Sequence, residues 1–254
     1  MAHTAVVDCS AVTGLNDPAF FDRYAHEYDE NDFYDPATTV DFLAGLAPAG
    51  TRVLELAIGT GRVALPLTTH GCRVEGIDGS PAMVERLRAK PGGTDIPVTI
   101  GDMADVAVDG PFRLAYLVFN TLFNLPSQER QIDCFRNVAE VLEPGGLFVI
   151  EAFVQDLTEF DRHQRVATRT LSEDSVKMEF LRHDPVEQAV TYQRVTFDAG
   201  GTTLRPLRLR YCWPSELDLM ARLAGMRLRE RHADWRRSPF TADSRAHVSV
   251  YEKP

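Results

Sequence analysis

A glycine-containing turn follows the first strongly apolar run of the chain, and it is the segment best suited to hold a ligand. Residues 52–56 predict a buried strand, after which the sequence reads Ala57-Ile58-Gly59-Thr60-Gly61. Glycine has no Cβ, so Gly59 and Gly61 let the backbone approach a ligand closely. The helix expected after the turn presents unpaired N–H groups on the same side. This combination is typical of a nucleotide-binding turn.

A carboxylate stands at the end of the second predicted strand, at residues 73–77. There Asp78 is placed to accept hydrogen bonds from both hydroxyls of a ribose. The alternative is that Asp78 only caps the next helix, but Ser80 serves that purpose better. The turn lacks the third glycine of a dinucleotide motif, since Ala64 stands there, and Glu55 precedes it. Together, the turn and the spaced acid predict a cofactor that contains adenosine.

The elements that position these residues alternate between strands and helices. Such alternation predicts a parallel sheet with helices on both faces, and two closing strands bring the sheet to seven. The predicted strands are residues 52–56, 73–77, 97–100, 114–119, 147–153, 226–233 and 247–251, and the helices are 18–28, 35–46, 61–70, 80–90, 127–142 and 213–225.

A different pattern interrupts this alternation after the fifth strand. Residues 165–211 alternate in period two, with turn signals at Asp184-Pro185 and Gly200-Gly201, which predicts half-exposed antiparallel hairpins. We therefore expect an α/β, Rossmann-like fold with an N-terminal helical lid and an antiparallel β insertion. The expected units are a flexible arm (1–17), the lid (18–47), the core (48–153), the insertion (154–212) and a closing helix with its strands (213–254).

Composition narrows the class of protein. The 254 residues are 44% hydrophobic and 25% charged, ordinary values for a globular protein. The net charge of −10 argues against a nucleic-acid partner. The four cysteines are scattered without metal-ligand spacing, so we expect no metal and reduced thiols in a cytoplasmic protein. No stretch approaches the ~20 apolar residues of a membrane span.

Four ordered segments resemble the motifs of class I S-adenosylmethionine (SAM)-dependent methyltransferases. Residues 55–61 (ELAIGTG) resemble their acidic, glycine-rich motif, with Ala57 in place of the first glycine. Residues 76–83 (GIDGSPAM) resemble the ribose-binding motif, 101–103 (GDM) the adenine-side motif, and 142–146 (LEPGG) the turn before the fifth strand. The resemblance covers residues 18–153, and the layout beyond is similar to that of bacterial aminosugar N-methyltransferases.

The resemblance implies SAM as the cofactor and a set of contacts to it. Glu55 and the turn of Ala57, Gly59 and Gly61 would hold the methionine part, and Asp78 the ribose. The adenine would lie between Gly79 and Met83 under Asp102 and Met103, with Phe119 and Asn120 facing the sulfonium. Tyr24 and Tyr28 of the lid would cover the cation, where an aromatic ring contributes about 0.5–2 kcal/mol. The alternative for both tyrosines is ordinary core packing.

The acceptor side carries weaker signals. Methyl transfer is an in-line displacement that depends on proximity, alignment and exclusion of water. An amine acceptor needs no strong base, whereas a hydroxyl or carbon acceptor usually does. The candidate bases are Glu151, His163, His183 and His26, and the candidate acceptor contacts are Asn124, Tyr211 and Trp213.

We expect a small-molecule acceptor, such as a natural-product intermediate, methylated on N, O or C. The chain would act as a monomer or homodimer, with the insertion as pocket wall or dimer contact. Two rival functions exist. A nicotinamide-dependent oxidoreductase would need the full dinucleotide turn and a Tyr-x-x-x-Lys pair, and the sequence has neither. A non-catalytic SAM-binding sensor would share the motifs and remains an alternative.

Overall fold

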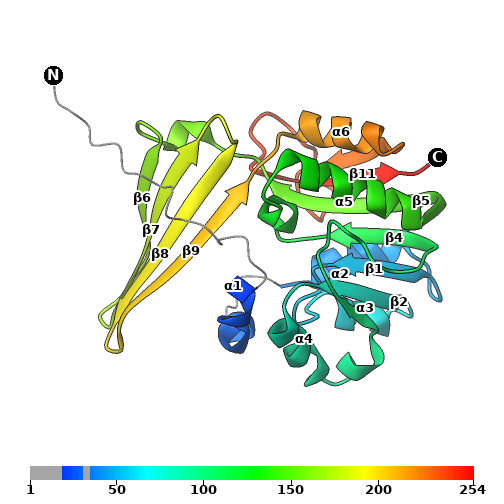
Figure 1. Cartoon of the computed structure of the whole chain (residues 1–254), viewed down its shortest axis with the longest axis horizontal. Coiled ribbons are helices and arrows are strands. Elements are labelled where there is room, and N and C mark those ends of the chain that lie inside the picture. Colours follow the sequence, from blue (N-terminus) through cyan, green and yellow to red (C-terminus); the bar gives the residue numbers. More distant parts are fainter. Residues whose placement is uncertain (1–18, 31–34) are drawn as a thin grey trace.

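The computed structural model describes residues 19–30 and 35–254, so the arm predicted for residues 1–17 lies outside the described residues. Two sheets organise the described chain (Figure 1). One has seven strands in the order β10-β11-β5-β4-β1-β2-β3, and the other has four strands in the order β6-β7-β8-β9. The expected Rossmann-like sheet and the separate antiparallel insertion are both confirmed.

Five strands of the large sheet are parallel, β11 pairs antiparallel with β5, and β10 at the edge pairs antiparallel with β11. The strands are β1 (Arg52–Leu56), β2 (Arg73–Asp78), β3 (Val98–Ile100), β4 (Phe112–Leu117), β5 (Leu142–Phe153), β10 (Arg227–His232) and β11 (Ala246–Glu252). In the register, Glu55 of β1 lies opposite Gly76 of β2 and Tyr116 of β4. The strand order reverses at β1 and β4, and ligands of open α/β sheets bind at the carboxyl ends beside such a reversal.

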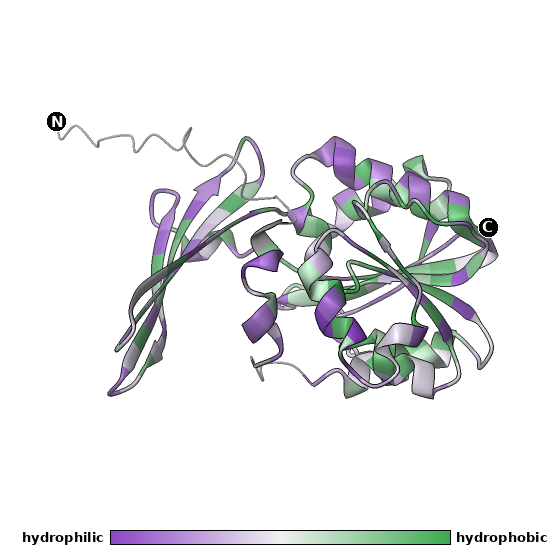
Figure 2. Ribbon diagram, turned by 60° about the horizontal axis from the view of Figure 1, so that its bottom comes forward, coloured by the Kyte–Doolittle hydropathy of each residue, from purple (hydrophilic) through white to green (hydrophobic). Residues whose placement is uncertain are grey.

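Helices cover both faces of this sheet (Figure 1). On one face pack α2 (Ala37–Leu46), α3 (Ala64–Thr69) and α4 (Pro81–Arg88), and on the other α5 (Gln128–Val141) and α6 (Pro214–Leu223). Alternate residues of each strand pack into two separate hydrophobic cores. Val53 and Tyr116 belong to the core beneath α2, α3 and α4, and Leu54 and Ala115 belong to the core beneath α5 and α6. Figure 2 shows the strands of the large sheet as the most hydrophobic part of the molecule.

The insertion consists of β6 (Gln164–Leu171), β7 (Ser175–Asp184), β8 (Ala189–Asp198) and β9 (Gly201–Arg210). It stands beside the core as a long, twisted sheet (Figures 1 and 2). Its base is joined to the core because Leu181, Val190 and Leu209 are buried in the same hydrophobic cluster as the β5 residue Ile150. Short 3-10 turns complete the described chain, at η1 (Ala25–Glu30), η2 (Gly93–Asp95), η3 (Thr121–Asn124) and η4 (Leu157–Glu159).

Two predicted elements differ from the structure. The single helix predicted for residues 18–28 is wrong: a short α1 (Ala19–Asp22) precedes the 3-10 turn η1. The break is held by i to i+3 hydrogen bonds from Tyr24 N to Phe21 O and from Glu27 N to Tyr24 O. Strand β5 also starts earlier than predicted. Gly145 N donates to Lys253 O and Lys253 N donates to Gly146 O, so pairing with the chain end extends the strand through the predicted turn.

The N-cap position of α2 is occupied by Pro36, and Asp35 Oδ1 before it accepts a hydrogen bond from Ala37 N. Serine hydroxyls cap two other helices: Ser80 accepts from Met83 N at the start of α4, and Ser127 accepts from Arg130 N at the start of α5. Such caps satisfy N–H groups that have no partner within the helix. Across residues 19–30 and 35–254, every helix is too short or too polar to cross a bilayer.

Candidate cofactor site

A cavity opens at the carboxyl edge of the large sheet, around the ends of β1, β2 and β3. Its walls come from the lid, the glycine turn, the β2–α4 junction, the loop after β3 and the segment after β4. The lining residues are Phe21, Tyr28, Ala57, Gly59, Asp78, Gly79, Ser80, Met83, Gly101, Asp102, Met103, Thr121, Asn124, Leu125 and Pro126. Eight predicted cofactor contacts and the predicted acceptor contact Asn124 are among them.

The glycine turn has the backbone that the sequence suggested. Gly59 and Gly61 have φ values of 56° and 76°, in the left-handed region that L side chains rarely adopt. A Cβ on Gly59 would lie 3.3 Å from the Met83 methyl, and one on Gly61 would lie 2.3 Å from Leu87 Cδ1. Ala57, which replaces the first glycine of the resembled motif, also has a positive φ of 55°. The substitution therefore keeps the turn and adds local strain.

Asp78 connects the turn to the end of β2. Its Oδ2 accepts a hydrogen bond from Gly59 N at 2.6 Å, and its Oδ1 accepts one from Ser80 N at 2.8 Å. Burial raises the pKa of this carboxyl above its usual range, opposed by the two backbone donors. Two carboxylate oxygens offer about four lone-pair sites, so Asp78 can accept further bonds from hydroxyls in the cavity.

Glu55 lies beneath the turn rather than in the cavity wall. It is 2% exposed, and its Oε2 accepts a hydrogen bond from Tyr116 Oη at 2.7 Å. Burial raises the pKa of Glu55 to about 8, although the bond from Tyr116 opposes the shift. The predicted contact of Glu55 with the methionine part of SAM stays a prediction.

The lid places one of its two predicted tyrosines at the cavity. Tyr28 lines it, and burial raises the pKa of the phenol. The Arg62 guanidinium lies between two rings, 4.6 Å from the Tyr28 centroid and 4.9 Å from that of Phe119. Tyr24 faces the insertion instead, where its hydroxyl donates to Leu204 O at 3.4 Å. Arg62 was not identified from the sequence, although it directly follows the glycine turn.

Two lid carboxylates fasten the lid to the core. Asp29 accepts a hydrogen bond from the Thr60 hydroxyl at 2.6 Å and pairs with Lys90 Nζ at 2.9 Å. Asp22 accepts one from the Ser80 hydroxyl and another from Ala82 N, at the start of α4. These bonds could not be predicted from the sequence, because their partners are distant along the chain.

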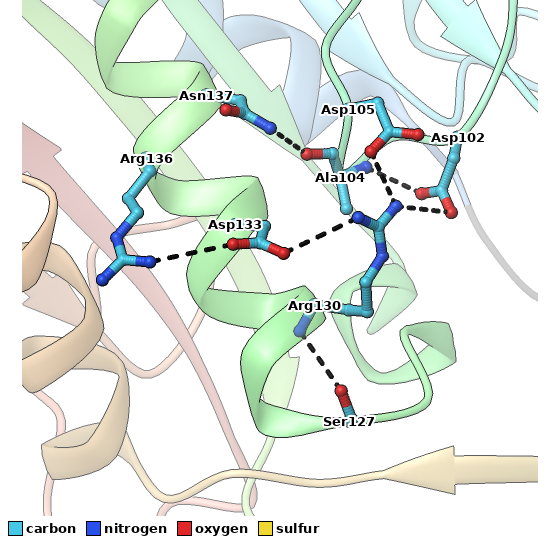
Figure 3. Close-up of polar contacts among 8 residues, drawn as sticks. All are labelled: Asp102, Ala104, Asp105, Ser127, Arg130, Asp133, Arg136 and Asn137. Carbon is cyan, nitrogen blue, oxygen red and sulfur yellow. Dashed lines mark hydrogen bonds and ion pairs between the residues drawn. The ribbon is translucent and has the colours of Figure 1, made fainter.

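The loop after β3 is fixed by an arginine of α5. Arg130 pairs with Asp102 at 3.0 Å and with Asp105 at 2.9 Å, and Asp102 Oδ1 accepts a bond from Ala104 N (Figure 3). The guanidinium points from the helix into this loop and holds the Asp102 carboxylate at the cavity edge (Figure 3). Met103, the next residue, lines the cavity, and its predicted contact with the adenine stays a prediction.

Phe119 and Asn120, which were predicted to contact the sulfonium, form the turn after β4. Glu151, a predicted base, reaches this turn: its Oε2 accepts from Phe119 N and its Oε1 from Trp235 Nε1, both at 2.8 Å. Burial raises the pKa of the Glu151 carboxyl, opposed by these two donors. These three predicted residues lie next to the cavity-lining η3 segment and are not themselves part of the lining.

The other predicted acceptor residues gather at the base of the insertion. His183 Nε2 and Tyr211 Oη are 2.9 Å apart, and burial lowers the pKa of His183. The ring of His163 lies 5.7 Å from that of His183, and the ring of Trp213 5.7 Å from that of Tyr211. This aromatic cluster does not line the cavity described above. His26 is exposed on the lid.

The cavity fits a nucleoside with a charged amino-acid tail. Met83, Met103 and Leu125 offer apolar contacts to a flat base, and Asp78 offers acceptors to ribose hydroxyls. The left-handed glycine turn leaves room for close backbone approach, and Arg62 beside it can pair with a carboxylate. The adenine, the ribose and the carboxylate of SAM thus each have a chemically suitable partner.

Comparison with known proteins agrees with this geometry. A family model described as a methyltransferase domain matches residues 53–146. The cypemycin N-terminal methyltransferase of Streptomyces sp is 29% identical over 248 residues, which cover 94% of this chain and 100% of that protein. The structure of the CcbJ methyltransferase from Streptomyces caelestis matches with a TM-score of 0.84 and 38% identity, over 92% of this chain and 97% of that one.

A third match shares the fold at lower identity. SAM-bound CalS10, an amino pentose methyltransferase from Micromonospora echinaspora involved in calicheamicin biosynthesis, has a TM-score of 0.66 and 20% identity. The match covers 93% of this chain and 95% of that one. The likeness therefore includes the insertion as well as the large sheet.

Proposed function

Because the chain belongs to the SAM-dependent methyltransferases, we propose that it methylates an amine nitrogen of a small molecule in natural-product biosynthesis. The names of several relatives support this choice. They include the cypemycin N-terminal methyltransferase, an amino pentose methyltransferase and a sugar N-methyltransferase. Three described cysteines are free and buried, which supports a reducing, cytoplasmic setting.

Residues that line the cavity, together with Arg62 beside it, would each bind a different part of the cofactor. Asp78 would accept the ribose hydroxyls, Met83 and Met103 would enclose the adenine, and Arg62 would pair with the carboxylate. The Tyr28 ring would face the cation, a contact that is strongest where water is excluded. When bound, SAM supplies a methyl group on a sulfonium that is already a good leaving group. The protein then needs mainly to align the acceptor and exclude water.

The observation that favours an amine is the hydrogen bonding of two candidate bases, the half-buried Glu151 and the buried His183. Glu151 already accepts two hydrogen bonds, and His183 is bonded to Tyr211 with its pKa lowered by burial. A neutral amine attacks the methyl carbon with its own lone pair, and the new ammonium group releases its proton to water afterwards. A hydroxyl acceptor would need a base within hydrogen-bond reach.

The test is transfer of radiolabelled methyl from SAM to paired acceptors. Each pair matches an amine with its hydroxyl analogue, for example an amino sugar with the parent sugar and a free N-terminal peptide with its hydroxy-acid counterpart. Methylation of the amines alone is expected, and Asp78→Ala serves as the inactive control. Transfer only to hydroxyl partners would contradict the proposal. Tight SAM binding without transfer to any acceptor would favour the alternative function, a non-catalytic SAM-binding sensor.

A further inference from the structure

Two consecutive residues after β4 adopt a backbone that L side chains rarely take. Phe119 and Asn120 have φ values of 58° and 61°, and neither is glycine. Such strain persists only where surrounding contacts hold it, and it gathers at functional sites. The contacts that hold this turn therefore show what fixes the site.

Two reciprocal hydrogen bonds join the turn to β5. The Glu151 carboxylate of β5 accepts from Phe119 N at 2.8 Å, and the Asn120 side chain accepts through Oδ1 from Phe153 N at 2.6 Å. Each link uses a side chain on one segment and a backbone amide on the other. The turn is thus held on both sides, by a carboxylate and by an amide.

The second oxygen of Glu151 is also bonded. It accepts from Trp235 Nε1 at 2.8 Å, and the Trp235 ring packs edge-on against Phe42 of α2 at 5.3 Å. Trp235 is 8% exposed, so the carboxylate lies under a fixed indole. In the described chain Glu151 forms no ion pair, and each of its oxygens is used to hold a neighbouring N–H group.

The turn sets the direction of a cavity wall. Asn120 directly precedes η3, and Thr121, Asn124 and Leu125 line the cofactor cavity. The Phe119 ring lies under the Arg62 guanidinium, which belongs to the glycine turn. A change at residues 119–120 therefore reaches both the wall and the glycine turn.

We propose that Glu151 is a positioning residue that holds the Phe119–Asn120 turn left-handed and so fixes the wall of the cofactor cavity. It acts through the turn and not as the base that takes a proton from the acceptor. The proposal concerns the cofactor site of the family and does not depend on which acceptor is methylated.

The test compares wild type with Glu151→Gln and Trp235→Phe by amide hydrogen exchange, with and without S-adenosylhomocysteine. Glutamine keeps the size of the side chain but has one acceptor oxygen for two donors. In E151Q, peptides covering residues 118–126 should exchange about tenfold faster, with a similar loss of S-adenosylhomocysteine affinity. Peptides of α5 should be unchanged and report that the fold is intact.

The control W235F removes the indole donor and leaves the Phe119 link in place. It should leave exchange at 118–126 and the affinity within about threefold of wild type. Unchanged exchange in folded E151Q, or equal loosening in W235F, would overturn the proposal. Exchange measured without ligand tests the turn alone, so failure of wild type to bind S-adenosylhomocysteine would count against the cofactor assignment instead.

A second pair of variants keeps the test decisive if E151Q does not fold. Asn120→Gly and Asn120→Ala both remove the bond to Phe153 N, but only glycine adopts the left-handed φ without strain. The alanine variant should therefore loosen residues 118–126 more than the glycine variant. Equal loosening would show that the turn does not need to be held left-handed.

Discussion

At the scale of single residues, two turns beside the cavity share a left-handed backbone. Ala57, Gly59 and Gly61 in one turn and Phe119 and Asn120 in the other all have positive φ values. Glycine adopts such a φ without strain, whereas the three other residues must be held in it by the surrounding structure. Both turns lie beside the same cavity, one within its wall and one directly before it.

Gly59→Ala should weaken SAM binding by about tenfold or more. The new Cβ would sit at a left-handed φ, 3.3 Å from the Met83 methyl, so the turn and a cavity-lining side chain must both shift. Titration calorimetry with SAM measures the effect. Gly45→Ala is the matched control, since Gly45 is exposed in α2 and a Cβ there has no neighbour within 4 Å. Equal affinity in both variants would refute the argument.

Glu55 should make stability depend on pH in the absence of cofactor. Its folded pKa is about 8, raised by burial from an ordinary 4.5. Between these values the folded protein keeps a proton that the unfolded chain has released. The stabilisation is complete below pH 4.5 and is lost as the pH rises through 8.

Glu55→Gln removes this titration while keeping the volume and an acceptor for Tyr116. Its free energy of unfolding, relative to wild type, should rise steadily between pH 5.5 and 8.5 in denaturant titrations. Glu173→Gln, at an exposed position between β6 and β7, is the matched control for the substitution itself. A constant difference between E55Q and wild type across this range would show that Glu55 is ionised in the fold.

At the scale of elements, the lid connects three parts of the molecule. Asp22 accepts a hydrogen bond at the start of α4, and Asp29 accepts one from the glycine turn. Glu27 forms an ion pair with Arg205 of β9 at 2.6 Å. Arg205 also lies 4.9 Å from the Tyr24 ring. The 3-10 turn that replaces the predicted helix lets neighbouring lid residues face different partners. The lid therefore contacts the insertion as well as the core.

Asp29→Asn should raise the Kd for SAM about three- to tenfold with little loss of thermal stability. The variant loses the ion pair between Asp29 and Lys90. Both side chains are partly exposed, so the loss of binding free energy is about 1 kcal/mol. Calorimetry gives the affinity, and Glu252→Gln, which breaks the exposed pair with Arg227, is the control. Wild-type affinity in D29N would mean that the lid closes without this contact.

At the scale of the whole molecule, cofactor binding should stabilise the folded state against thermal unfolding. The cavity is lined by Tyr28 of the lid, the ends of the early strands and Leu125 beyond β4, so a ligand there bridges distant segments. A ligand that binds only the folded state stabilises it by about 2.7 kcal/mol at one hundred times its Kd. For a chain of this size that corresponds to about 5–10 °C in Tm.

Thermal unfolding with and without SAM measures this shift. Asp78→Ala should abolish it, because the variant loses the ribose acceptors and the bond to Gly59 N. NAD at the same concentration should produce no shift in wild type. A shift with NAD and none with SAM would contradict the cofactor assignment and revive the oxidoreductase alternative.

The sequence by itself determined the seven-stranded sheet, the antiparallel insertion and a cofactor that contains adenosine, and the resemblance of four motifs to those of methyltransferases implied that this cofactor is SAM. Period-two and strand–helix patterns are local, and so is the segment from Glu55 to Gly61, which forms its turn within a few residues. Asp78 was also placed correctly beside this turn, since parallel strands bring their carboxyl ends to one edge.

Only the tertiary structure decided how the remaining side chains are used. Glu151 carries the sequence signature of a base at a strand end, yet its oxygens are taken by Phe119 N and Trp235 Nε1. Tyr24 and Tyr28 look equivalent along the chain, yet one meets the insertion and the other the cavity. These outcomes depend on partners distant in the sequence, which meet only after the sheet has closed and buried its donors beside the available acceptors.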